Sequence, residues 1–81
     1  MGDANYLSRL NAKIDTDVFI VTELKYFAKE VKRSLTKLTL STSERLYILQ
    51  VLTAIYELRL FYLNKVSTLG QARIDFLQRQ L

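Results

Sequence analysis

The stretch from Leu46 to Leu63, LYILQVLTAIYELRLFYL, constrains the fold of this chain more than any other segment. Its residues follow helical spacing, but its apolar side chains cover more than half of the helix circumference. A helix that packs against one neighbour needs an apolar stripe only about 100° wide. The polar side chains instead form one narrow column, which contains Gln50, Thr53, Glu57 and Asn64. Such a helix has to be enclosed on several sides, which predicts self-association or a partner protein.

The composition predicts an all-α protein. The chain contains no proline and only two glycines, Gly2 and Gly70. No segment alternates apolar and polar residues in the manner of a strand. Eighty-one residues suffice for a single helical domain over residues 1–81, with a core near the lower size limit for stability. A hydrophobic content of 49% excludes a disordered chain.

Apolar residues at steps of three and four predict a long helix over about residues 16–38. Its apolar stripe consists of Ile20, Leu24, Phe27, Val31, Leu35 and Leu38, with Val21 and Ala28 beside it. The sequence Asp15-Thr16-Asp17 indicates a break and a new helix start, because acids are favoured at helix N-termini. We therefore expect a separate short helix that ends near Lys13.

A capping box marks the next helix. In the sequence Ser41-Thr42-Ser43-Glu44, the serine and the glutamate each satisfy the other's free backbone N–H. This motif predicts a tight turn at about residues 39–41 and a helix over about residues 42–69. The two long helices would form an antiparallel helical hairpin.

Gly70 leaves two interpretations open. As a C′ glycine it would end the helix and start a short C-terminal helix. Alternatively the helix continues through it at a cost of about 1 kcal/mol. The second interpretation keeps two columns in register, which are Leu49, Tyr56, Leu63, Gly70 and Leu77, and Leu60, Ser67, Ile74 and Leu81. We favour the break, which would give a three- or four-helix bundle.

Apolar residues near the turn form the candidate protein interface. The short terminal helices would pack at the opposite end of the hairpin and leave the turn end uncovered. The interface residues are Leu38, Leu40, Leu46, Tyr47 and Leu49, with Tyr56 farther along. We expect them to complete the bundle by homodimerisation or to bind a helix of a partner protein. The alternative is a self-contained bundle with a few exposed leucines, which are ordinary on protein surfaces.

The net charge of +4 arises within residues 25–37. This segment holds one acid, Glu30, against five basic residues, which are Lys25, Lys29, Lys32, Arg33 and Lys37. The simpler interpretation is a solvated helix face that keeps a small protein soluble. The alternative is a nucleic-acid-binding face that contacts phosphates. No helix-turn-helix pattern supports the alternative.

The sequence offers little for catalysis. It has neither histidine nor cysteine, which removes the commonest general base and the commonest transition-metal ligands. It also lacks a glycine-rich phosphate loop. We therefore predict a protein with no catalytic residue, metal, cofactor or small-molecule substrate. The predicted function is that of a regulator, adaptor or chaperone-like interaction protein.

The apolar stretch also has about the length of a membrane span. However, Gln50, Glu57 and Arg59 lie inside it. A charged residue at the centre of a bilayer costs roughly 2.5–3.5 kcal/mol on insertion scales. We therefore expect a buried helix rather than a membrane span, in a cytoplasmic protein.

Overall fold

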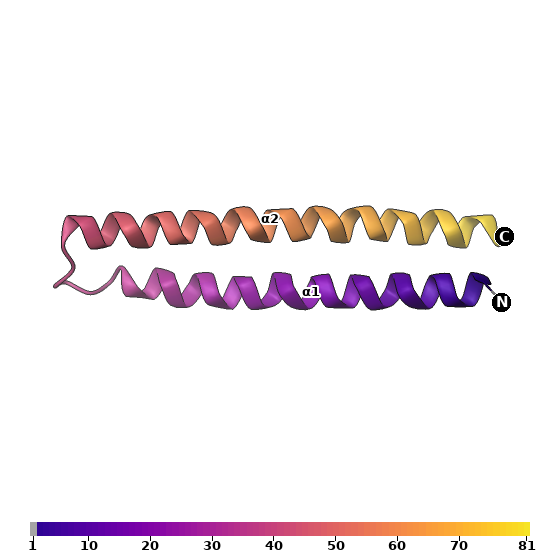
Figure 1. The fold of residues 1–81 in the computed structure, drawn as a ribbon, viewed down its shortest axis with the longest axis horizontal. Helices are drawn as coiled ribbons and strands as arrows, with labels where there is room; N and C mark the ends of the chain where they lie inside the picture. Colours follow the sequence, from indigo (N-terminus) through magenta and orange to yellow (C-terminus); the bar gives the residue numbers. More distant parts are fainter. Residues whose placement is uncertain (1) are drawn as a thin grey trace.

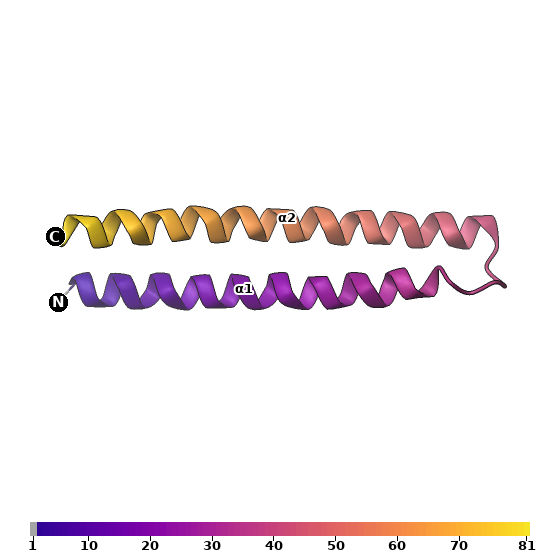
Figure 2. The ribbon, with the colours of Figure 1, turned by 180° about the vertical axis from the view of Figure 1, so that it is seen from behind.

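The computed structural model describes residues 2–81, which form two long antiparallel helices (Figure 1). Helix α1 comprises Gly2–Ser34, and helix α2 comprises Thr42–Arg79. The hairpin measures 61 × 15 × 14 Å. The two chain ends lie together at one end and the turn at the other, as the view from behind also shows (Figure 2). The predicted all-α antiparallel hairpin is confirmed.

The predicted capping box builds the start of α2, but the predicted helix end near Leu38 and tight turn at residues 39–41 are wrong. Helix α1 ends at Ser34, and residues 35–41 join the two helices. The backbone N–H groups of residues 35–37 donate to carbonyl oxygens three residues back, as at a tightened helix end. The backbone N–H of Glu44 donates to Ser41 Oγ, and the backbone N–H of Ser41 donates to Glu44 Oε1, both at 3.1 Å. Arg45 then reaches back to the end of α1, where its guanidinium donates to the carbonyl oxygens of Leu35 and Lys37, each at 3.1 Å. These bonds satisfy backbone groups that a helix end leaves without a partner.

The expected break at residues 15–17 is absent, and α1 runs through it. Thr16 Oγ1 donates to the carbonyl oxygen of Ala12 at 2.9 Å, as it does inside a helix. Asp17 is buried, on the same face of α1 as the buried Leu10, Ile14 and Val21. A break would remove this face from α2, so packing outweighs the local preference of these residues for a helix start.

The expected break at Gly70 is absent as well. Gly70 has no positive φ, and α2 continues to Arg79. The predicted short N- and C-terminal helices are therefore the outer parts of α1 and α2. Within residues 2–81 a single copy forms two helices, so a bundle of more helices requires a further molecule.

The two helices meet along a strict heptad pattern, which we call the inner seam. Its members are buried or half-buried, at steps that alternate between three and four. They are Leu7, Leu10, Ile14, Asp17, Val21, Leu24, Ala28 and Val31 on α1, Leu35 just after the end of α1, and Arg45, Ile48, Leu52, Ile55, Arg59, Tyr62, Val66, Leu69, Arg73 and Phe76 on α2. This is the pattern of coiled-coil packing.

The inner seam corrects the predicted stripe of residues 20–38. Val21 and Ala28 lie at the buried centre, whereas Phe27 is 54% exposed and Leu38 is 93% exposed. The small side chain of Ala28 packs in one cluster with Leu52 and Ile55. Residues 20–38 alone do not distinguish the inner seam from the neighbouring column of residues, and the predicted stripe combined members of both. The heptad repeat over all of α1 identifies the column that packs against α2.

The expectation that no segment spans a membrane is also corrected. Helix α2 is long and apolar enough to cross a bilayer, and only 11% of its most apolar 18-residue window is buried. The prediction assumed that the helix would be enclosed by protein. The structure shows that α1 covers one side of it only.

Candidate interaction surfaces

The hairpin has a small core and a large apolar surface. The buried apolar residues are Leu10, Ile14, Val21, Ala28, Leu52 and Ile55. Most of the large apolar side chains of α2 are instead exposed, including Leu60 at 59% and Phe61 at 55%. Because soluble monomers rarely expose contiguous apolar patches above a few hundred Å², this surface is the candidate site.

The predicted interface residues divide between two places. Leu38 and the half-buried Leu40 lie in the turn between the helices. Tyr47, 67% exposed, lies beside them at a small hollow lined by Leu40, Ser43, Glu44 and Ile48. Leu46, Leu49 and Tyr56, between 46% and 56% exposed, lie on a different face of α2. The structure therefore brings Leu40 and Tyr47 together at this hollow, places the 93% exposed Leu38 in the same turn, and puts the other three residues on another face. We call Leu38, Leu40 and Tyr47, at the turn end of the hairpin, the turn patch.

Those three residues belong to a second heptad pattern, which we call the outer seam. Because α2 is continuous through Gly70, the two apolar columns of the sequence interleave along the whole helix. The outer seam consists of Leu46, Leu49, Thr53, Tyr56, Leu60, Leu63, Ser67, Gly70, Ile74, Leu77 and Leu81. All are exposed except the half-buried Gly70. This heptad repeat is present in the sequence, but a helix that ends at Gly70 would contain only the part of the repeat before that residue.

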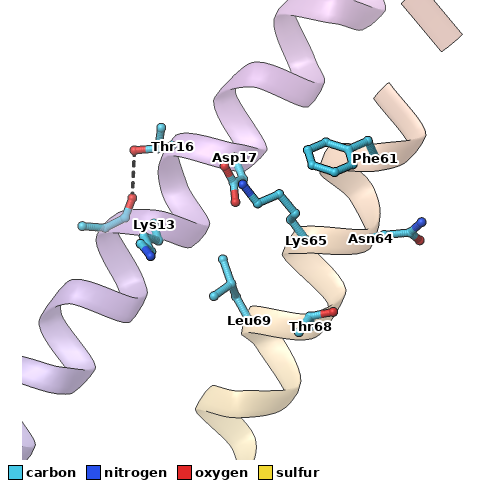
Figure 3. A pocket seen from close by; sticks show the side chains of 9 residues that line it. Lys13, Thr16, Asp17, Phe61, Asn64, Lys65, Thr68 and Leu69 are labelled. Atoms are coloured by element: carbon cyan, nitrogen blue, oxygen red, sulfur yellow. Dashed lines mark hydrogen bonds between the residues drawn. The ribbon is translucent and has the colours of Figure 1, made fainter. Parts of the chain in front are cut away.

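A groove of about 480 Å³ lies between the helices, lined by residues of both (Figure 3). Lys65 extends from α2 toward Asp17 on α1 (Figure 3), and its Nζ lies 5.4 Å from the centre of the Phe61 ring. The remaining lining residues are Ala12, Lys13, Thr16, Asn64, Thr68 and Leu69.

The basic residues of the alternative site are all exposed. Lys25, Lys29 and Lys32 share one face of α1, since they lie at i, i+4 and i+7. Arg33 Nη1 instead pairs with Glu30 Oε1 at 3.0 Å, and because both side chains are more than 60% exposed this pair contributes little stability. Lys37 lies apart from them, in the turn.

The inner seam contains three arginines that were not predicted to pack between the helices: Arg45, Arg59 and Arg73. Their 14-residue spacing is visible in the sequence. Arg73 Nη1 donates to Asn11 Oδ1 across the hairpin at 3.0 Å. Arg59 Nε is buried without a hydrogen-bond partner among residues 2–81. These cations interrupt the apolar seam and so limit the stability of a single hairpin.

The described residues hold no group of three or more acids that could bind a metal ion. Comparisons with protein families, with curated proteins and with solved structures find no match to this chain. The functional argument therefore depends on the surfaces described above.

Proposed function

We propose that this chain is a non-enzymatic interaction protein of the regulator, adaptor or chaperone-like kind. It binds a partner protein through its exposed apolar helical surface and works as a homodimer. One observation carries this proposal: α1 covers a single face of α2, and large apolar side chains remain exposed on the other faces.

The turn patch of Leu38, Leu40 and Tyr47 is the surface we assign to the partner protein. Leu38 and Leu40 lie in the turn that joins the helices at one end of the hairpin, after α1 has ended at Ser34, and Tyr47 lies near the start of α2. The turn is at the end of the rod opposite to the chain termini (Figure 1). Tyrosine and leucine side chains bury a large area at low entropic cost, and tyrosine is enriched among residues that dominate binding energy. Helix-in-groove docking is the binding mode that suits such a surface.

The test is site-specific photocrosslinking in the producing cell. A benzophenone amino acid replaces Tyr47, and a matched variant carries it at Glu57, an exposed residue of the polar column. We expect the Tyr47 probe to give a discrete adduct with another protein, and the Glu57 probe to give none there. The change Leu38→Asp, at a side chain that is 93% exposed, should abolish the adduct without altering helicity.

Flotation with phosphatidylcholine vesicles provides the contrary outcome. Helix α2 has the length and apolarity of a membrane span, so a bilayer competes with protein for its exposed surface. If the chain floats with the vesicles and the Tyr47 probe yields no protein adduct, the protein-binding function is wrong.

A second candidate function is nucleic-acid binding through the basic face. It is favoured by one observation: the ion pair found among residues 2–81 is Glu30–Arg33, and it leaves Lys25, Lys29 and Lys32 aligned and exposed on α1. Such a face is suited to neutralising phosphates along a duplex.

A further inference from the structure

We propose that the outer seam of α2 binds the outer seam of a second copy in antiparallel orientation. The two-fold axis passes between Phe61 and Tyr62, and two hairpins form a four-helix bundle. This inference rests on the proposed function, since it uses the same exposed apolar surface. It specifies that a second copy of the chain binds to this surface, and it gives the orientation and the register of that copy.

The spacing of the outer seam requires a helix as its occupant. Steps that alternate between three and four over 11 positions, from Leu46 to Leu81, are the pattern of knobs-into-holes packing along a helix. The seam is as long as α2 itself. A second α2 therefore matches it in both length and pattern.

The angle between the two seams indicates a four-helix bundle. Each outer-seam position within α2 follows an inner-seam position by one residue, as Leu46 follows Arg45 and Leu49 follows Ile48. One residue corresponds to about 100° around a helix. The two neighbours of a helix in a square four-helix bundle lie about 90° apart, so α2 presents one seam to each neighbour.

The order of large and small residues determines the orientation. In a parallel pair each residue would meet its own copy, so that Tyr56 would crowd Tyr56 while Gly70 faced Gly70 across a gap. In the antiparallel pair, Gly70 and Ser67 each meet a larger residue, and the other layers pair large apolar residues. The layers pair Leu46 with Leu77, Leu49 with Ile74, Thr53 with Gly70, Tyr56 with Ser67, and Leu60 with Leu63 of the second copy. Close packing favours the antiparallel arrangement.

Gly70 supports this register independently. The hairpin does not need a glycine there, because its φ is not positive and an added Cβ would meet nothing within 4 Å. A glycine inside a helix costs about 1 kcal/mol relative to alanine. A second helix backbone that approaches closely at this layer, with Thr53 opposite, would require a small residue here, whereas a single copy does not.

Charge and area are compatible with this pairing. The residues that flank the outer seam at seven-residue spacing are Gln50, Glu57, Asn64, Gln71 and Gln78. The one charged residue among them, Glu57, lies level with Val66 of the second copy and not with Glu57 of that copy. A hairpin side of 61 × 15 Å offers about 900 Å², close to the roughly 800 Å² per partner of a stable interface.

Cysteine crosslinking tests the register, because the natural chain contains no cysteine. Leu46→Cys and Leu77→Cys lie at exposed positions, 56% and 45% respectively. We expect an oxidised mixture of the two variants to form a disulfide-linked heterodimer. Leu46→Cys alone should form none, because its two copies lie about 46 Å apart along the helices in this register, at 1.5 Å per residue. Tyr47→Cys mixed with Leu77→Cys is the matched control that should not crosslink.

A second pair of variants tests the surface by mass. Light scattering should give twice the chain mass of 9.5 kDa for the wild type. Leu60→Glu, at the centre of the outer seam, should weaken the dimer by about a hundredfold or more, because it places an acid opposite Leu63 in each of the two central apolar layers. Leu58→Glu is the matched control, since Leu58 is 46% exposed on another face. Circular dichroism should show both variants helical.

The outcomes separate this inference from the proposed function. Disulfide formation by Leu46→Cys alone would mean a parallel dimer and would overturn the register. A monomer at all concentrations would overturn the inference altogether. A parallel dimer would leave the proposed function intact, whereas a monomer would also contradict its homodimeric part. In both cases the adduct of the Tyr47 probe separately tests binding of a partner protein. Loss of that adduct with an intact antiparallel dimer would instead contradict the protein partner.

Discussion

At the level of single residues, hydrogen bonds at the turn determine where α2 begins. Ser41 and Glu44 exchange two bonds, and Arg45 joins the start of α2 to the end of α1 through two carbonyl oxygens. Ser41 and Glu44 act within one helical turn, which is why the sequence predicted the capping box correctly. Asp17 and the seam arginines act across the hairpin, and their positions followed only from the packed structure.

The capping box makes the stability of the hairpin depend on pH. Hydrogen bonds from the backbone N–H of Ser41, and then with its side chain, hold the pKa of Glu44 below its ordinary value of 4.5. Since the folded carboxyl has the lower pKa, its contribution is present above the ordinary value and is lost as the pH falls through the folded pKa. We therefore expect Glu44→Gln to reduce the loss of Tm between neutral pH and pH 3.

Thermal melts followed by circular dichroism would measure this difference. Glu57→Gln is the matched control, because Glu57 is an exposed helical acid outside the capping box. It should keep the pH dependence of the wild type. Equal pH dependence of the wild type and Glu44→Gln would contradict a stabilising role for the ionised cap.

At the level of the helices, continuity is the main result. Each helix contains one segment that local preference would interrupt, residues 15–17 in α1 and Gly70 in α2. In both cases the inner seam continues on either side of the segment, so a break would remove residues such as Leu10 or Phe76 from their partners. Tyr6 packs against Phe76 with ring centres 5.1 Å apart, which holds the open end of the hairpin together.

Helix continuity predicts the effect of Gly70→Ala. In the monomeric Leu60→Glu background, alanine should stabilise the hairpin by about 1 kcal/mol, because it is the better helix former and its Cβ meets nothing within 4 Å. Urea unfolding would measure this change. A loss of stability would instead indicate the left-handed helix end, where glycine is required.

At the level of the whole molecule, the hairpin is a rod with little interior. In the described part of the chain six apolar residues are buried, distributed along a length of 61 Å, and none of the described side chains is fully buried. The remaining apolar surface lies outside, on α2 above all. A molecule of this shape gains stability by association, which links its fold directly to its proposed function.

The charge of the whole molecule predicts the outcome for the second candidate function. If the basic face binds phosphates, a labelled DNA duplex should bind tightly at 50 mM salt and far more weakly at 200 mM. Lys29→Glu with Lys32→Glu should abolish this binding. Lys13→Glu with Lys65→Glu, at the groove, brings the net charge of +4 to zero in the same way and should retain it. Fluorescence anisotropy would measure both, and no binding at micromolar protein would exclude this function.

The sequence by itself determined the helical class, the antiparallel hairpin, the helix start after Ser41 and the presence of more apolar surface on α2 than one neighbour can cover. These features follow from short-range chemistry, namely capping bonds, the absence of helix breakers and the period of the apolar residues. The same reasoning wrongly predicted breaks near Asp15 and Gly70. Its stripe over residues 20–38 was right at Leu24, Val31 and Leu35, which belong to the inner seam, and wrong at Ile20, Phe27 and Leu38, which do not.

Only the tertiary structure decided the continuity of the helices, the register of the inner seam and the exposure of α2. A local helix stop is worth about 1 kcal/mol, which is less than the burial of even one or two large apolar side chains, at about 1.5–3 kcal/mol each. Contacts across the hairpin therefore override it. Exposure also depends on the number of neighbours that a helix has, and only the tertiary structure shows that α2 has one within its own chain.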